Sequence, residues 1–447
     1  MHILVLNGSP KGEYSITLQT VRYLEKLHPE HRFEVLHVGQ KPKALEKDFS
    51  PAAEAIGRAD VLLFSYPVYT FIAPCQLHRF IELMKQHKVD VTGKIATQIT
   101  TSKHFYDVTA HRYIQDNVQE MGMNFIRGLS ADMDDLTTQK GRKEAENFWD
   151  HFCWCVEKGY FEPYTPAAGG YSPVPVTAAE ECQQEKPGNV VIITDAKPED
   201  TQLNGMIARF RAKLPYATRV VNLWEYPFKG GCLGCFKCAV SGKCVHKDNF
   251  DEFLRGDIQT SQAMIYAFTI KDHSMGARFK MYDDRQFCNG HRTVTIGMPV
   301  GYLISGDYSS ETNLQTIIEG RAQVGSNILA GIATDERDTD AAIDRLTESL
   351  AYALENKNTG PQNFLGVGGM KIFRDLIYQM RGFMRADHKF FKSHGQYDFP
   401  QKKWPVSLAM YLVGAMIANP KVHAKMGSKM NEGMLMPYKK VLEDMDK

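Results

Sequence analysis

Residues 2–17 read HILVLNGSPKGEYSIT, and this stretch decides the fold. A short apolar run, His2–Leu6, ends in Asn7-Gly8-Ser9-Pro10, and a helical pattern follows from Ser15 to Leu27. Three further apolar runs have strand character: Phe33–Val38, Val61–Tyr66 and Ile95–Thr100. Because strands that alternate with helices build parallel sheets, and near-continuous apolar strands need cover on both faces, we predict an α/β domain with helices on both sides of its sheet.

The same alternation starts again after a segment rich in Pro, Gly and Glu, residues 163–188. The second set of strand patterns is Asn189–Thr194, Thr218–Leu223, Gln262–Phe268, Thr293–Met298 and Asn327–Thr334. Thr201–Lys213 and Thr339–Leu354 are helical in pattern, and only helical patterns remain beyond Gly360. We therefore predict two α/β domains at 1–161 and 189–358, a linker at 162–188 and a helical C-terminal extension at 359–447.

Composition limits the class of protein. Apolar residues make up 43% of the 447 residues, which predicts sizeable cores, and 53 Lys and Arg against 52 Asp and Glu argue against nucleic acid as the main partner. The uncharged and mostly apolar stretch Trp404–Ala418 is shorter than the roughly 20 residues of a membrane span. Nine cysteines without a secretory signal favour the cytoplasm, where clustered cysteines serve metal or redox chemistry.

The loop after the first strand has the composition of a phosphate site. Gly8 admits a tight turn, and the hydroxyl groups of Ser9, Ser15 and Thr17 can donate to an anion, with Lys11 beside them. The N–H groups and dipole of the following helix attract the same charge, and ligands of such sheets bind where the strands end. A plain helix cap would explain Ser15 alone.

These residues resemble a known family. Gly8-Ser9-Pro10-Lys11 with Ser15-x-Thr17 is similar to the FMN phosphate loop of the flavodoxin-like NAD(P)H-dependent FMN reductases, and Ser65–Tyr69 followed by Ala73–Leu77 resembles their flavin-ring loop. The resemblance implies two tandem flavodoxin-like, doubly wound, parallel five-stranded sheets of order 2-1-3-4-5. It implies FMN contacts from Ser9, Lys11, Ser15, Thr17, Pro67, Val68, Tyr69 and Thr70. A third flavin loop is placed by topology at Thr100–Ser102. Glu82-Leu83 departs from the family's usual Asp-Arg.

The second unit carries a cysteine motif of spacing C-x2-C-x2-C-x5-C on a Gly-rich loop. Its members are Cys232, Cys235, Cys238 and Cys244. Thiols at three-residue intervals can reach corners of one cluster while glycine N–H groups donate to the sulfurs. The motif resembles that of the iron–sulfur flavoproteins, which implies a [4Fe–4S] cluster. Zinc held by four thiolates, or free thiols, are the alternatives.

The two units divide these motifs between them. In the second, Asp195, Glu199 and Asp200 put negative charge where a phosphate would lie, which predicts weak FMN binding there. Phe279–Arg285 keeps the family's Asp-Arg ending. We expect an internal pseudo-dimer in which the cysteine loop faces Tyr66–Thr70, the alternative being two independent domains on a flexible linker.

The function that these features predict is electron transfer. NADH or NADPH would reduce FMN, and electrons would pass, with the cluster as a relay, to a small-molecule or protein acceptor. The alternative is a non-enzymatic electron carrier or redox sensor with the same cofactors. No catalytic residue is singled out, and a homo-oligomer is compatible with the fold.

Overall fold

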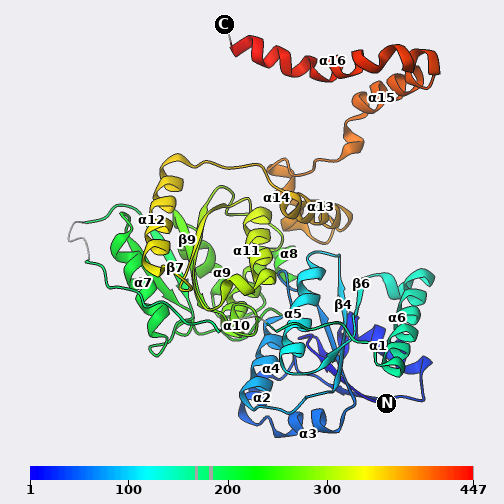
Figure 1. Ribbon diagram of the computed structural model, residues 1–447, viewed down its shortest axis with the longest axis vertical. Coiled ribbons are helices and arrows are strands. Elements are labelled where there is room, and N and C mark those ends of the chain that lie inside the picture. The colour runs from blue at the N-terminus through cyan, green and yellow to red at the C-terminus, as the bar shows by residue number, and fades with distance from the viewer. Residues whose placement is uncertain (167–169, 181–184, 446–447) are drawn as a thin grey trace. The chain divides into compact units, whose positions relative to one another are not determined.

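The computed structural model describes residues 1–166, 170–180 and 185–445. The chain divides into two compact units, Met1–Phe390 and Phe391–Lys447, and the first unit contains both sheets (Figure 1). Parts of the predicted linker, 167–169 and 181–184, lie outside the described residues. The boundaries at 161 and 189 stay predictions.

The first sheet is parallel and has the predicted order, β2-β1-β3-β4-β5. Its strands are β1 (His2–Asn7), β2 (Arg32–Leu36), β3 (Val61–Pro67), β4 (Ile95–Ser102), β5 (Asn124–Phe125) and β6 (Leu129–Asp132). The sheet therefore has six strands, one more than the five predicted. β5 and β6 share the fifth position, since both pair with β4. The break between them contains Gly128, where a Cβ would lie 2.2 Å from the carbonyl oxygen of Gln98.

The second sheet repeats this order with five parallel strands, β11-β10-β9-β7-β8. Its strands are β7 (Val190–Thr194), β8 (Thr218–Asn222), β9 (Ala263–Thr269), β10 (Pro299–Ser305) and β11 (Ile328–Thr334). Counted from β7, the order is again 2-1-3-4-5. The predicted strand at Thr293–Met298 is wrong, because the strand lies at β10, where all seven residues are buried. Val294 and Ile296 are exposed, and Gly297 has a φ of +74° that interrupts extended backbone.

Both sheets are covered on both faces, which confirms the doubly wound class (Figure 1). The helices that pack on the first sheet are α1 (Ile16–Leu27), α3 (Ser50–Arg58), α4 (Cys75–Gln86), α5 (Asp107–Glu120) and α6 (Gln139–Lys158). Those on the second are α7 (Thr201–Lys213), α10 (Gly276–Arg285), α11 (Thr312–Gly325) and α12 (Thr339–Asn356). The sheet needs cover on both faces because successive side chains of a strand point to opposite faces. In β1, Leu4 and Leu6 belong to one apolar cluster, and Ile3 and Val5 belong to the other.

The remaining elements are short turns or belong to the extension. The short helices are α2 (Pro42–Lys47), α8 (Lys237–Ser241), α9 (Phe250–Phe253) and a π turn at Leu254–Ile258. The 3-10 turns are Gly12–Tyr14, Asp135–Thr137, Gln286–Asn289, Tyr308–Ser310 and Pro400–Lys402. The extension is helical, as predicted, with α13 (Phe364–Gln379), α14 (Arg385–Ser393), α15 (Trp404–Ile417) and α16 (Pro420–Met445).

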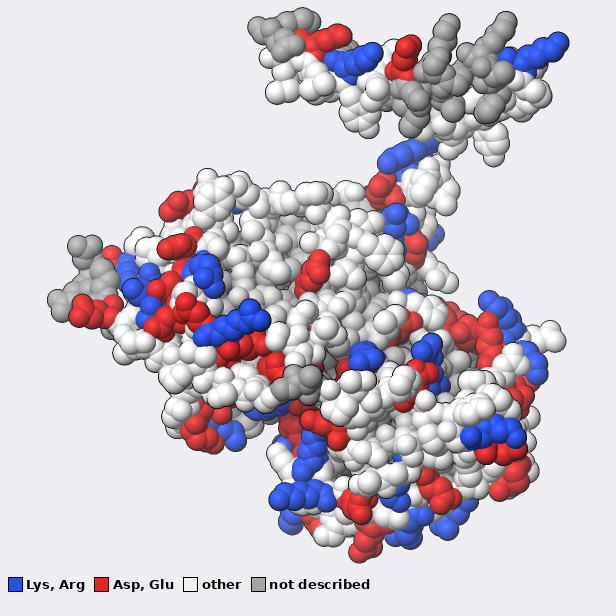
Figure 2. Space-filling model, viewed as in Figure 1, with Lys and Arg blue, Asp and Glu red and all other residues white. Residues whose placement is uncertain are grey.

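Charge is mixed over the visible surface. On the face shown in Figure 2, Lys and Arg lie interspersed with Asp and Glu, in keeping with a net charge of +1. Among the described residues, no helix combines the length and the apolar character needed to cross a bilayer.

Candidate functional site

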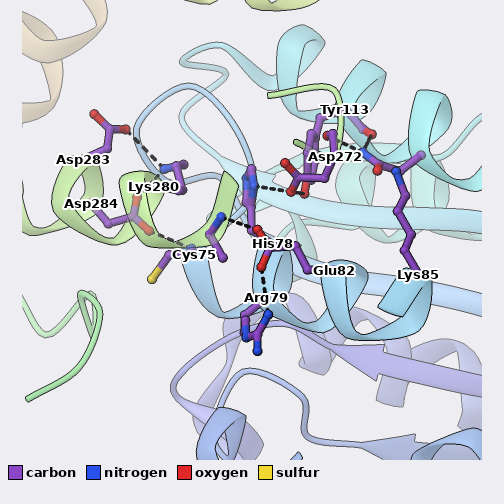
Figure 3. Close-up of polar contacts among 12 residues, drawn as sticks. Cys75, His78, Arg79, Glu82, Lys85, Tyr113, Asp272, Lys280, Asp283 and Asp284 are labelled. Atoms are coloured by element: carbon purple, nitrogen blue, oxygen red, sulfur yellow. Dashed lines mark hydrogen bonds and ion pairs between the residues drawn. The ribbon is translucent and has the colours of Figure 1, made fainter. Parts of the chain in front are cut away.

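The two α/β halves meet through α4 and α10, which cap one another (Figure 3). The backbone N–H of Cys75 donates to Oδ2 of Asp284 at 2.8 Å, and the backbone N–H of Ala277 donates to Oε1 of Glu82 at 2.7 Å. Residue 277 is 202 positions after 75, and 284 is 202 after 82, so the two contacts are reciprocal. Reciprocal contacts are the mark of a two-fold relationship between like surfaces. The Glu82 that departs from the family pattern thus has a partner in the second half.

Buried charges hold one end of this interface. Lys280 is fully buried and forms an ion pair with Asp284, and its Nζ donates to the carbonyl oxygen of Tyr69 at 2.9 Å. Burial raises the pKa of Asp284, and Lys280 acts in the opposite direction. The hydroxyl of Thr70 donates to the same carboxylate at 3.1 Å. These contacts from the second half therefore fix the Tyr69–Thr70 loop of the first.

A buried cluster fixes the other end. Nδ1 of His78 lies 2.9 Å from Oδ2 of Asp272, and the hydroxyl of Tyr113 donates to the same oxygen at 2.6 Å (Figure 3). All three side chains lie in the interior, and the rings of His78 and Tyr113 stack 4.1 Å apart. Asp272 has a φ of 47°, as its counterpart Thr70 has a φ of 44°, so each half places a left-handed loop against the helix of the other.

A cavity of about 180 Å³ opens beside this interface. The predicted FMN contacts all line it: Ser9, Lys11, Ser15, Thr17, Pro67, Val68, Tyr69 and Thr70. The four cysteines of the predicted cluster also line it: Cys232, Cys235, Cys238 and Cys244. Sequence positions between 162 and 235 residues apart therefore line one cavity.

The predicted phosphate loop leads into the N-terminus of α1. Ser15 is the N-cap of α1, and its side chain accepts from the N–H of Leu18 at 3.4 Å. The hydroxyls of Thr17 and Thr101 lie 2.6 Å apart, which ties α1 to the loop that topology placed at Thr100–Ser102. The first turn of α1 carries no acidic residue. A helix N-terminus with hydroxyl donors and no carboxylate fits the phosphate of FMN.

The corresponding loop of the second half does not fit a phosphate. Asp195 is buried there, and burial raises the pKa of its carboxyl to about 6 even though Lys271 lies 3.4 Å away. The chain also approaches this place itself, because Gln202, in the first turn of α7, donates to the carbonyl oxygen of Val174 at 2.7 Å. Negative charge and a peptide segment occupy the region that the first half leaves to a ligand.

The cysteine loop packs directly on the predicted flavin-ring loop, as expected for the internal pseudo-dimer. Nε2 of Gln76 donates to the carbonyl oxygen of Cys232 at 3.3 Å. Two glycines make the close approach possible: a Cβ on Gly231 would lie 2.3 Å from Sγ of Cys75, and one on Gly234 would lie 1.8 Å from the hydroxyl of Tyr69. Gly234 also has a φ of +59°. A side chain at either position would push the two loops apart.

The four cysteines share a wall but are not gathered around one point. Sγ of Cys238 donates to the carbonyl oxygen of Phe287 at 2.8 Å, and burial raises the pKa of this thiol to about 11. Sγ of Cys232 accepts from the N–H of Gly234 at 3.5 Å. Among the described residues, no three His, Cys, Asp or Glu side chains are arranged to hold a metal ion. The thiols and their N–H donor suit a cluster chemically, but the loop does not present them in a closed ligand set.

An arginine anchors the cysteine loop to α10. Arg285 is buried and makes two bonds to Asp248, at 2.7 and 2.8 Å, and one to the carbonyl oxygen of Gly230 at 2.8 Å. Although burial raises it, the pKa of Asp248 is held at about 2 by Arg285. Arg285, the last residue of the Asp-Arg ending that the sequence singled out, therefore holds the loop at both of its ends, Gly230 and Asp248.

Several lining residues carried no signal in the sequence. The aromatic and apolar part of the wall consists of Phe105, Phe236, Phe287, His291, Ile372, Phe373 and Leu376. The last three come from α13, in the extension that the family resemblance does not cover. Phe373 stacks on Phe105 at 4.5 Å, so the extension closes one side of the cavity. Helical periodicity predicted α13 itself but not the surface on which it lies.

Residues 1–134 match the family model described as NADPH-dependent FMN reductase. A curated relative, FMN-dependent NADH:quinone oxidoreductase 2 of Pseudomonas syringae pv. tomato (strain ATCC BAA-871 / DC3000), is 32% identical over 118 residues. The alignment covers 20% of this chain and 56% of the relative, so the chain spans about half the length of the curated relative it matches. The family match confirms the resemblance that the two loop motifs predicted for the first unit.

Solved structures also resemble parts of the chain. FerB, a flavoenzyme NAD(P)H:(acceptor) oxidoreductase from Paracoccus denitrificans, is 20% identical, with 35% of this chain and 97% of FerB covered and a TM-score of 0.30. General stress protein 14 from Treponema denticola, in complex with FMN, is 15% identical, with 35% and 98% covered and a TM-score of 0.27.

Proposed function

We propose that this protein is an NAD(P)H-dependent flavoenzyme that binds one FMN in the cavity between its two halves. The observation that carries the proposal is the convergence on one cavity of all eight residues predicted from the loop motifs. The family match over residues 1–134, which contains both loops, supports the same ligand. NADH or NADPH would be the electron donor.

The residues of the chain would hold and orient the cofactor. The N-terminus of α1, with Ser9, Ser15 and Thr17, would bind the phosphate, and Lys11 would neutralise part of its charge. The backbone of Pro67–Thr70 would border the ring, and it is held in place by Lys280 from the second half. FMN supplies the hydride chemistry, so the task of the protein is to bind, to orient and to limit access of water.

The acceptor proposed here is a quinone. The curated relative carries quinone in its name, and the cavity wall formed by Phe287, His291 and Phe373 is aromatic, which suits a planar ring. The alternative, an electron carrier or redox sensor without turnover, rests on the same cofactors. It is favoured only if the flavin is not reduced by either nicotinamide.

The cysteine loop supports a second, finer proposal. We propose that Cys232, Cys235, Cys238 and Cys244 hold a [4Fe–4S] cluster, with zinc as the competing ligand of the same thiols. The loop lies against the Tyr69 loop, and an N–H group already points at one sulfur. Binding requires the four thiols to draw together. We further propose a cytoplasmic location, and a homo-oligomer stays a prediction.

The test is an anaerobic titration of the purified full-length protein with NADH and with NADPH. The released flavin is first identified by chromatography. The proposal expects one FMN per chain, bleaching of its visible absorption by one or both nicotinamides, and reoxidation by tetramethyl-1,4-benzoquinone. A protein that contains FMN but is bleached by neither nicotinamide would support the carrier instead. A protein that binds no FMN would overturn both.

A further inference from the structure

A buried carboxylate from the C-terminal extension orients a histidine in the cavity wall. Asp387, in α14, is fully buried and accepts from the backbone N–H of His291 at 3.2 Å. It also lies 3.0 Å from Nδ1 of His291 and accepts from Nη1 of Arg292 at 2.9 Å. Because an ionised carboxylate only accepts hydrogen bonds, Nδ1 of His291 must carry a proton. A proton on Nε2 is then the only one that the ring can give up without losing this bond.

The other nitrogen of the ring is left without a protein partner. Among the described residues, no hydrogen-bond partner is found for Nε2 of His291. This atom is also absent from the fully buried polar atoms that lack a partner, so it is not fully buried. His291 lines the proposed flavin cavity and also a second cavity of about 160 Å³. It therefore borders both cavities.

Aromatic contacts place this histidine near the proposed flavin-ring loop. The ring centroid of His291 lies 4.8 Å from that of Phe373 and 6.0 Å from that of Phe287. The ring centroid of Phe287 also lies 6.2 Å from that of Tyr69. Phe287 thus contacts both His291 and Tyr69, in a wall that suits a planar aromatic ligand. The chemistry that such a position allows is proton transfer to a bound acceptor.

We infer that His291 is the proton donor to a quinone reduced in this cavity, with Asp387 as its positioning residue; the inference rests on the proposed function. Reduction of a quinone to the hydroquinone takes one hydride and one proton. Reduced FMN, when bound, would supply the hydride, and the quinone that takes it up would become a hydroquinone anion. The Nε2–H bond of His291 breaks, its proton forms an O–H bond on the anion, and the histidine is left neutral. Solvent returns the proton.

The first test separates proton donation from damage to the fold. Reduced full-length protein is mixed in a stopped flow with tetramethyl-1,4-benzoquinone, whose fully substituted ring does not alkylate thiols, or with ferricyanide, which takes electrons without a proton. His291→Gln should slow reoxidation by the quinone by about a hundredfold and leave the ferricyanide rate within about twofold. Asp387→Asn should slow the quinone reaction less. An equal loss with both acceptors, or no loss with either, would overturn the inference.

A matched control and a second readout complete the design. His2→Gln is the control, because it removes another histidine–carboxylate pair, in which Nε2 of His2 lies 2.9 Å from Glu34. His2 begins β1, whereas the phosphate loop follows the end of that strand, so this variant should change neither rate. The second readout needs no turnover: 4-nitrophenol is added to oxidised protein, and its visible absorption reports phenol or phenolate. Wild-type protein should bind it as the phenolate, next to the donor proton, and His291→Gln should shift it toward the phenol.

The two readouts also distinguish this inference from the proposed function. If wild-type flavin is never bleached by nicotinamide but bound nitrophenol still shifts with His291→Gln, the proton site stands and the reductase proposal fails. If the flavin is bleached normally but wild-type protein causes no change in nitrophenol absorption, or His291→Gln causes the same change, the proton site is wrong and the reductase proposal stands.

Discussion

The backbone N–H of Cys75 and the carboxylate of Asp284, 209 residues apart, are joined by a hydrogen bond of 2.8 Å at the start of α4. The matching bond between Ala277 and Glu82 makes the relationship reciprocal. One chain thus contains an interface of the kind that two identical chains form around a two-fold axis. Because the halves differ, the phosphate loop comes from one and the cysteines from the other, and both reach the same cavity.

The phosphate loop gives the first prediction. Ser9→Asp places a carboxylate in a buried position, where it would face the phosphate of FMN. At about 4 Å and an effective dielectric constant of about 20, like charges repel by about 4 kcal/mol, which corresponds to a roughly thousandfold loss of affinity. The measurement is the FMN content of the purified variant and its fluorescence titration with added FMN. Ser50→Asp, at the exposed start of α3, should retain the cofactor. Stoichiometric FMN in the Ser9 variant would show that Ser9 does not contact the phosphate.

The cysteine loop gives the second prediction. Anaerobically purified protein should contain roughly four irons and four acid-labile sulfides per chain, and Cys235→Ala should lose most of both. Cys153→Ser, in α6 and outside the loop, should keep them. Iron, zinc and sulfide are measured on the same sample. One zinc per chain without sulfide would show that the cysteines hold a structural zinc ion and not a cluster. The absence of any metal would show that they are free thiols.

The contact between the cysteine loop and Tyr69 gives the third prediction. Gly234→Ala should lower the free energy of unfolding by roughly 1–2 kcal/mol because residue 234 has a left-handed backbone. The added Cβ would also clash with the hydroxyl of Tyr69. Gly242→Ala in the same loop is a matched control, because its φ of +76° is similar but nothing lies within 4 Å of its Cβ. Urea unfolding should show Gly234→Ala to be less stable than Gly242→Ala by about 1 kcal/mol or more. Equal losses would mean that the loops do not touch in solution.

The fourth concerns pH. His273 of the second half lies between Glu311, at 2.9 Å, and Glu120 of the first half, at 3.4 Å. Burial lowers its pKa, but the two carboxylates raise it to a net value of about 9. The folded protein therefore holds this proton more tightly than the unfolded chain does. This proton therefore stabilises the folded protein fully below about pH 6.5, and the stabilisation is lost as the pH rises through about 9. The free energy of unfolding that is lost amounts to at most about 3 kcal/mol.

The measurement is the free energy of unfolding in urea between pH 6 and pH 9.5. In His273→Asn, which tolerates the left-handed φ of 58°, the decline of stability across this range should become shallower than in the wild type. His28→Gln removes an exposed histidine–glutamate pair and should leave the decline unchanged. A wild-type stability that does not fall between these pH values would argue against the ion triad.

Local pattern determined much of this protein. The alternation of apolar strands and amphipathic helices predicted both doubly wound sheets, because each strand buries its own residues whatever lies beyond it. The loop at Ser9–Thr17 could be recognised because its turn, hydroxyls and helix start lie within nine residues. The strand at Thr293–Met298 was misplaced because its residues have strand propensity, whereas the seven residues that follow supply the burial. Strand propensity that is not accompanied by burial does not determine where a strand forms.

Only the tertiary structure decided what faces the phosphate loop. Phe373 and Asp387 come from an extension with no recognisable motif, and their value to the cavity depends on contacts with residues about 96 to 268 positions away, at His291 and Phe105. The approach of Gly234 to Tyr69 likewise depends on the packing of α4 against α10. Sequence periodicity reports which face of an element is buried, but not which distant surface covers it. The loops of the cavity could therefore be predicted from the sequence, whereas the wall that closes it, and the histidine within that wall, could not.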